Sequence, residues 1–175
     1  MLVIGMREGM NQQDSLYTES QRFDQWWIWG IVLIAPLVFC WLIYRQIILG
    51  LEVGDNPLPD LVLFAIALVL GVGPVALIYA CRLDTVVTGD GLFIRFRPFH
   101  RRWVEFLHPD VLEVEAATYS GLRDYGGWGI RYGARGKAYT VRGDQGVMLR
   151  LSDGKNCMIG SQNVESFMCA MLRDG

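Results

Sequence analysis

Residues 26–44 read WWIWGIVLIAPLVFCWLIY, and residues 61–81 read LVLFAIALVLGVGPVALIYAC. Neither stretch contains a charged side chain. At a rise of about 1.5 Å per residue, a helix of roughly 20 apolar residues covers the hydrocarbon core of a bilayer. A helix on the surface of a soluble protein would show a polar stripe every three to four residues, and both stretches lack one. We therefore predict two transmembrane helices, at residues 26–45 and 61–81.

The charges that flank the two stretches predict their orientation. The link at residues 46–60 contains acidic residues but no lysine or arginine, whereas several arginines follow the second stretch. Because basic residues are retained on the cytoplasmic side, we expect this link to be extracytoplasmic. Residues 1–25, as an N-terminal tail, and residues 82–175 are then both cytoplasmic, at the plasma (inner) membrane. Arg45, at the outer end of the first stretch, is the one residue that opposes this orientation.

The N-terminal tail has no clear periodicity. Residues 17–23 are mostly polar and lead directly into the first apolar stretch. Two interpretations stay open for them, a short helical turn at the membrane interface and an unstructured segment. No strand is predicted in this part of the chain.

After residue 82 the apolar residues alternate with polar ones, as Leu92, Ile94 and Phe96 do. A period of two is typical of strands that bury one face. The same pattern predicts inward positions for Val104, Phe106, Leu112, Val114, Ala116, Val147, Leu149 and Leu151. Turn sequences rich in glycine, aspartate and proline separate these runs. We predict about seven short strands, which form a strongly bent sheet or barrel.

The period changes again near the C-terminus. Apolar residues stand at i, i+3, i+4, i+7 and i+8, namely Val164, Phe167, Met168, Met171 and Leu172. This spacing predicts one amphipathic helix, whose apolar face would cover an open end of the bent sheet. The fold class expected is thus an α+β membrane protein, with a two-helix transmembrane hairpin followed by a bent sheet and one C-terminal helix.

Three segments carry a resemblance to a known family: YGGWGIR at residues 125–131, KAYTVRG at 137–143 and IGSQ at 159–162. With the two spans and the strands that follow, they resemble an uncharacterised family of bacterial two-span membrane proteins with a C-terminal bacterial pleckstrin-homology-like (PH-like) domain. The resemblance covers the chain from about Tyr17 to its end. It implies a PH-like fold for residues 82–175 and implies no activity.

The sequence offers no motif for catalysis or for a cofactor. The glycine-rich segment 126–136 fails as a phosphate-binding loop, because Arg131 and Ala138 stand where glycine and serine or threonine are required. His100 and His108 lack the spacing of a triad or a metal centre, and the four cysteines form no C-x-x-C pair. We therefore predict no catalytic, cofactor-binding or metal site, and a protein that is not an enzyme.

Four arginines follow the second apolar stretch closely, and these are Arg95, Arg97, Arg101 and Arg102. Each cation near an anionic membrane surface contributes about 1 kcal/mol of binding. They are candidates for contact with anionic lipid, although they could equally serve only topology and solubility. Residues 82–175 carry 13 basic and 11 acidic residues, a balance that does not favour nucleic-acid binding.

Two functions follow from these features as hypotheses. The first is a non-catalytic membrane protein whose cytoplasmic domain is a binding or regulatory module at the inner leaflet, with the lipid bilayer and a protein as partners. The second is an oligomeric membrane component, such as a pore or an accessory subunit of a transporter. In this alternative, Gly71 and Gly73 of the second stretch allow close packing of helices in a homo-oligomer.

Overall fold

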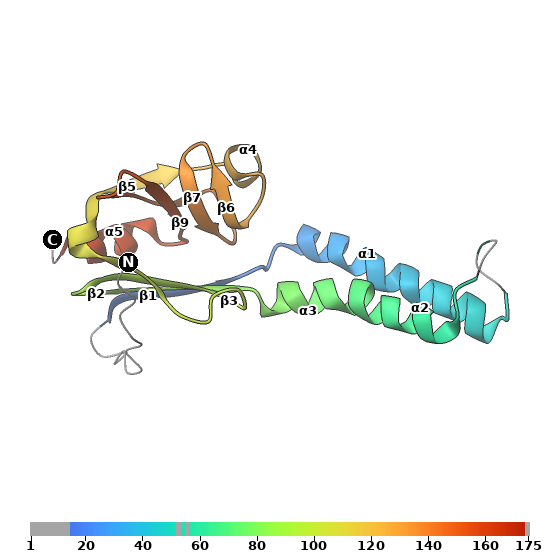
Figure 1. The fold of residues 1–175 in the computed structure, drawn as a ribbon. Helices are drawn as coiled ribbons and strands as arrows, with labels where there is room; N and C mark the ends of the chain where they lie inside the picture. The colour runs from blue at the N-terminus through green and yellow to red at the C-terminus, as the bar shows by residue number, and fades with distance from the viewer. Residues whose placement is uncertain (1–14, 52–53, 55–56, 174–175) are drawn as a thin grey trace. The chain divides into compact units, whose positions relative to one another are not determined.

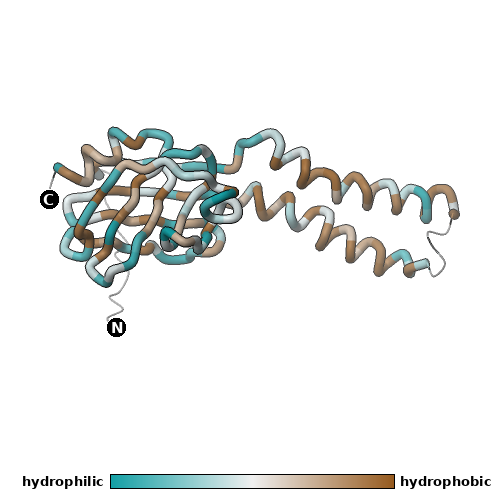
Figure 2. The backbone as a smooth tube through the Cα atoms, turned by 90° about the horizontal axis from the view of Figure 1, so that it is seen from above, coloured by the Kyte–Doolittle hydropathy of each residue, from teal (hydrophilic) through white to brown (hydrophobic). Residues whose placement is uncertain are grey.

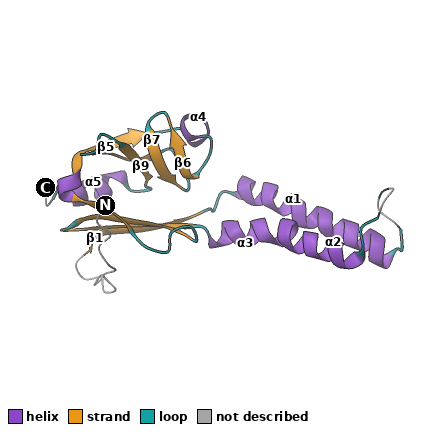
Figure 3. Ribbon diagram, viewed as in Figure 1, coloured by secondary structure: helices purple, strands orange, loops and turns teal. Residues whose placement is uncertain are grey.

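The computed structural model describes residues 15–51, 54 and 57–173. The chain forms two compact units, shown in Figures 1 and 3. We call residues 15–22 with 82–173 the sheet domain and residues 23–81 the helix pair. Residues 1–14 of the predicted tail lie outside the described residues, as do Glu52 and Asp55 of the predicted external link.

The helix pair consists of two long helices, of which the first ends in a π-helical segment and the second is interrupted by one. Its elements are α1 (Trp26–Ile43), a π-helical segment (Tyr44–Ile48), α2 (Asp60–Ile66), a second π-helical segment (Ala67–Val72) and α3 (Gly73–Ala80). The two continuous helices have 23 and 21 residues, long and apolar enough to span a membrane. Figure 2 shows hydrophobic residues along both helices.

The helices of this pair are exposed rather than buried. In the most apolar 18-residue window of each, 6% of the first helix and 17% of the second are buried. The core helix of a soluble protein would be mostly buried, because its apolar surface is what stabilises the fold.

The first sheet of the sheet domain is antiparallel and has the order β1-β2-β3-β4. Its strands are β1 (Ser15–Arg22), β2 (Arg82–Thr88), β3 (Gly91–Arg97) and β4 (Val104–Leu107). Leu92, Ile94 and Phe96 are at most 1% exposed, which confirms the inward face predicted for β3. Leu83 and Val87 of β2 are fully buried beside them, so these two strands form one wall of the core.

Strand β1 was not predicted, and the expectation of a helical turn or an unstructured segment is wrong for Ser15–Arg22. This segment pairs with β2, from Ser15 opposite Thr88 to Arg22 opposite Arg82. The connection between these two neighbouring strands is the helix pair itself. The helix pair is therefore an insertion between β1 and β2, and the chain enters and leaves it from the same end of the sheet.

The second sheet has five strands in the order β5-β8-β9-β7-β6. Its strands are β5 (Val111–Thr118), β6 (Gly129–Gly133), β7 (Gly136–Thr140), β8 (Gln145–Leu151) and β9 (Asn156–Gly160). Strands β7 and β9 are parallel, and the other neighbours are antiparallel. The described residues thus hold nine strands rather than about seven. The two sheets do not close into a barrel.

Of the inward positions predicted for the second sheet, two in β8 are confirmed, whereas Leu112 and Ala116 of β5 are exposed. Val147 and Leu149 are fully buried. Leu112 is 66% exposed, however, because the pairing of β5 with β8 shifts register between Val111 and Glu113. A bulge of this kind turns the neighbouring side chain to the other face, and the period of two does not reveal it.

The remaining helices cover the sheets. Helix α5 (Val164–Leu172) confirms the predicted C-terminal helix, and it contacts both sheets through its buried residues Phe167, Ala170 and Met171. Figure 1 shows it between the two sheets, at one end of the sheet domain. Helix α4 (Gly121–Tyr125) joins β5 to β6.

The inward side chains of strand β1 form hydrogen bonds with the last residue of β9 and the two residues that follow it. The Glu19 carboxylate accepts hydrogen bonds from the Ser161 hydroxyl and the Gln162 backbone N–H, both at 2.8 Å, and from the Tyr17 hydroxyl at 2.6 Å. The Gln21 amide donates to the Gly160 carbonyl at 2.7 Å. These polar contacts hold β1 in place where an apolar strand would use packing.

Candidate functional site

The outer face of the first sheet carries a cluster of arginines at the end where the helix pair is inserted. Residues directly opposite each other in antiparallel strands share one face of the sheet. Two rows across β1, β2 and β3 follow from the register, Arg22–Arg82–Arg97 and Ser20–Asp84–Arg95. We call Arg22, Arg82, Arg95 and Arg97 the arginine face.

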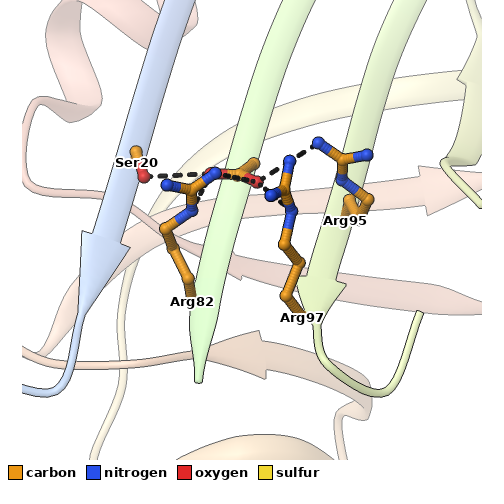
Figure 4. A network of polar contacts seen from close by, with 5 residues as sticks. Ser20, Arg82, Arg95 and Arg97 are labelled. Carbon is orange, nitrogen blue, oxygen red and sulfur yellow. Dashed lines mark hydrogen bonds and ion pairs between the residues drawn. The ribbon is translucent and has the colours of Figure 1, made fainter. Parts of the chain in front are cut away.

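The Asp84 carboxylate binds three of these arginines (Figure 4). Arg82 approaches it with two nitrogens, Nε at 2.8 Å from Oδ1 and Nη2 at 3.1 Å from Oδ2. Arg97 Nε lies 3.2 Å and Arg95 Nη2 3.6 Å from Oδ2, and the Ser20 hydroxyl donates to Oδ1 at 2.9 Å. One carboxylate therefore holds three guanidinium groups in fixed positions.

The arginine face remains positive after this pairing. The Asp84 side chain is only 10% exposed, and a buried carboxylate is costly unless cations compensate its charge. The Arg97 side chain is 43% exposed, so part of its charge faces solvent. Burial lowers the pKa of Arg95, as does the neighbouring Arg97, and Asp84 opposes both effects. With Glu105, which lies on the same face in the next row of the register, four arginines and two carboxylates leave an excess of two positive charges. Such a surface attracts anions.

The loop that follows β3, residues 98–103, extends this basic surface, and we call it the β3–β4 loop. Arg101 and Arg102 are exposed in it, and the guanidinium of Arg95 lies 4.4 Å from the ring centre of Trp103. His100 packs edge-on against Tyr139 of β7, with ring centres 5.7 Å apart. Burial and the neighbouring Lys137 lower the pKa of His100.

The structure thus brings the four arginines of the sequence prediction to one region, in two different settings. Arg95 and Arg97 lie around Asp84, and Arg101 and Arg102 lie in the β3–β4 loop. Sequence reasoning missed the counter-ion Asp84 and the row partners Arg22 and Arg82. A pattern within one strand could not indicate them, because the register between strands decides which residues become neighbours.

The two glycines predicted to pack helices have different surroundings. A Cβ added to Gly71 would lie 3.3 Å from the Phe39 ring and 3.4 Å from the Pro36 backbone, so Gly71 permits the close approach of the two helices within one chain. A Cβ at Gly73 would meet only the Leu68 carbonyl, at 3.9 Å.

Replacement of Gly71 by leucine is expected to separate the two helices of the pair, because the side chain would enter the space of Phe39. The distance between spin labels on α1 and α3 should rise, and Gly73→Leu, the matched control, should leave it unchanged. If Gly73→Leu instead lowered the yield of a crosslinked dimer while Gly71→Leu had no effect, Gly73 would serve contacts between chains and Gly71 would not serve the contact between the two helices.

A cavity of about 550 Å³ in the sheet domain lies beside α4. Two of the polar side chains that line it, Ser120 and Asp124, accept hydrogen bonds from the backbone of α4 and its N-cap. The Asp124 carboxylate accepts a hydrogen bond from the Ser120 backbone N–H at 2.9 Å, and the Ser120 hydroxyl accepts one from the Arg123 backbone N–H at 3.3 Å. These contacts cap α4 in the manner of a capping box. Across the described part of the chain, no three metal-binding side chains form a group.

Comparison with known proteins places the chain in a family. No curated protein matches the sequence. The sequence profile of DUF6141, a family of unknown function, matches residues 11–174, which include both apolar helices and the whole sheet domain. The chain therefore belongs to the DUF6141 family.

Proposed function

We propose that this protein is a non-catalytic integral membrane protein, in which the helix pair spans the inner membrane twice and holds the sheet domain at its cytoplasmic surface. The sheet domain then serves as a binding or regulatory module. The observation that carries this proposal is the insertion of two exposed apolar helices between the paired strands β1 and β2.

The pairing of β1 with β2 supports an even number of spans. Strand β1 precedes the helix pair and β2 follows it, yet the two strands are hydrogen-bonded neighbours. Strands on opposite sides of a membrane could not pair. Both ends of the helix pair must therefore emerge on one side, and the six arginines of the arginine face and the β3–β4 loop favour the cytoplasmic side.

The role of the sheet domain is proposed from its architecture. Two facing sheets and a C-terminal helix are compatible with the PH-like fold that the sequence resemblance implies. Folds of this kind act in many proteins as binding modules, so the proposal of a binding role rests on fold analogy. The outer edges of β1 and β6 end their sheets and would accept an extended peptide.

The alternative function, an oligomeric pore or transporter accessory subunit, draws less support. It relies on small residues of the second helix that remain open to another chain. Gly71 is instead buried against the first helix of the same chain. Crosslinking in native membranes would revive this alternative if it captured homo-oligomers.

The topology is tested with the cysteines of the chain. Cys169 is exposed on α5, whereas Cys157 is buried and its pKa is raised to about 12 by that burial, so its thiol stays protonated and unreactive. In a Cys40→Ser background, a membrane-impermeant maleimide should label Cys169 only after spheroplasts are permeabilised. A Leu51→Cys variant, changed in the predicted external link, should be labelled in intact spheroplasts.

The outcomes of this experiment separate the orientations. Labelling of Cys169 and not of the residue 51 thiol in intact spheroplasts would mean that the orientation is reversed. Equal labelling of both positions in intact spheroplasts would show that the helix pair does not span the membrane. Extraction of the protein by alkaline carbonate would show the same.

A further inference from the structure

We propose that the β3–β4 loop is a third point of membrane contact, at which Phe99 enters the interface of an anionic leaflet while Arg101 and Arg102 bind lipid phosphates. This inference rests on the proposed membrane anchoring. It goes further in naming a surface, its partner and the residue that inserts.

The chain itself limits the distance between Phe99 and the end of the second apolar helix. Arg82 follows the second apolar helix, which ends at Ala80, after a single residue, and Arg82 is paired with Arg97. The loop begins immediately after Arg97. From the reach of the backbone and the spacing of paired strands, Phe99 lies at most about 20 Å from the end of that helix, whatever the orientation of the two units.

The β3–β4 loop is held by contacts of His100 and exposes the aromatic ring of Phe99. The His100 backbone N–H donates to the Phe96 carbonyl at 2.7 Å, and the His100 ring packs on Tyr139. The Phe99 ring lies 6.1 Å from the ring of Phe96, centre to centre, and Phe99 remains 59% exposed. The loop therefore presents this ring to the outside instead of burying it.

Positively charged residues surround Phe99 in the sequence. Arg97, Arg101 and Arg102 lie within three residues of Phe99. Elsewhere in the sheet domain Leu112 is similarly exposed, at 66%, but its neighbours Asp110 and Glu113 are acidic. An apolar side chain among cations is the combination that binds an anionic membrane surface, because burial of the ring and attraction to phosphate act together.

Leu112 is an exposed apolar residue far from the helix pair in the register of the first sheet, so it serves as a control for Phe99. It follows Leu107, which pairs with Gly91 at the turn between β2 and β3. That turn is at the end of the first sheet opposite Arg82. Phe99 and Leu112 are thus two exposed apolar residues near opposite ends of the sheet. Phe99 has basic neighbours, and Leu112 has acidic neighbours.

The test is limited trypsin digestion of the full chain in nanodiscs, which leave both membrane faces accessible. One set contains phosphatidylcholine alone and the other contains phosphatidylcholine with phosphatidylglycerol. Cleavage after Arg101 and Arg102 should be at least fivefold slower in the anionic discs, since each cation contributes a factor of about 5. Cleavage after Arg173, which is exposed at the end of α5, serves as the internal reference.

Variants separate the ring from the charge. Phe99→Ser, which removes the ring without adding a charge, should remove the protection and Phe99→Trp should retain it, whereas Leu112→Ser should leave it unchanged. Because Phe99 and Leu112 are both exposed, these changes leave the core intact. Protection that persists in Phe99→Ser would overturn the insertion of the ring, and equal cleavage in both lipids would overturn the contact altogether.

A soluble anion is the other source of phosphate. Glycerol phosphate added to the phosphatidylcholine discs should give no protection, and protection by it would overturn the assignment to a bilayer. The maleimide experiment above decides the anchoring independently. If the helix pair spans but the loop is cleaved equally in both discs, the inference about Phe99 fails while the proposed function stands.

Discussion

Replacing Phe167 with alanine is expected to lower the free energy of unfolding of the sheet domain by about 3–5 kcal/mol, the usual cost of removing a buried phenyl ring. Phe167 is fully buried on α5, and its ring stacks on Tyr17 of β1 at 5.3 Å with an interplanar angle of 5°. The ring therefore joins the C-terminal helix to the strand that precedes the helix pair. Its loss should release both elements.

Hydrogen–deuterium exchange of the full chain in detergent micelles measures this effect. The amides of β1 and α5 should exchange much faster in Phe167→Ala, because exchange reports the free energy of local opening. Leu172→Ala is the control on the same helix, since Leu172 is 61% exposed and its loss should change the free energy by less than about 0.5 kcal/mol. Equal effects of the two variants would contradict the packing described for α5.

Replacing Asp84 with alanine should lower the free energy of unfolding by about 2–3 kcal/mol, because three arginines would lose their shared counter-ion. This figure lies below that of a fully buried ion pair, since the arginine side chains are 23–43% exposed. The freed arginines should also bind anionic membranes more tightly. Asp84 thus limits the positive charge of the arginine face while it orders the face.

Salt distinguishes charge from packing in this prediction. The deficit of Asp84→Ala should shrink in about 1 M salt, where the screening length is about 3 Å and the repulsion among the arginines weakens. Ser20→Ala removes one hydrogen bond to the same carboxylate and should cost about 1 kcal/mol, with little dependence on salt. Unfolding by urea at two salt concentrations measures both. A deficit that does not change with salt would mean that Asp84 contributes by packing alone.

Phe167 contacts β1 and Asp84 lies in β2, and these are the two strands that continue into the helix pair. Strand β1 continues into the first helix after three residues, and the second helix continues into β2 after one. The helix pair is therefore joined covalently to two neighbouring strands, and the first of these contacts α5 through the rings of Tyr17 and Phe167. The two short chain connections, at residues 23–25 and at residue 81, link the helix pair to the sheet domain.

Several elements could be predicted from local patterns. The two apolar helices follow from stretches without charge, α5 follows from its spacing of three and four residues, and β3 and β8 follow from alternation. In β3, β8 and most of α5 the apolar residues of the pattern are the ones that the element buries, whereas the two apolar helices are recognised by their length and lack of charge. Such patterns depend on hydrophobicity alone, which can be read from the sequence.

Strand β1 escaped prediction for a reason that lies in its inward face. Tyr17, Glu19 and Gln21 point inward there, opposite Val87, Thr85 and Leu83 of β2. Two of these three side chains are polar and Tyr17 carries a hydroxyl, so no apolar alternation marks the strand. Their hydrogen bonds go to residues 160–162, about 140 positions away in the chain, and only the folded structure provides these partners.

The same distinction applies to the candidate site. The sequence by itself determined that two helices are apolar enough to cross a membrane, that arginines follow the second, and that strands and one helix complete the chain. The tertiary structure alone decided that β1 belongs to the sheet domain, that the helix pair is an insertion, and that Asp84 gathers three arginines. Hydrophobicity is a property of each residue, whereas register and ion pairing depend on which distant residues the fold makes neighbours.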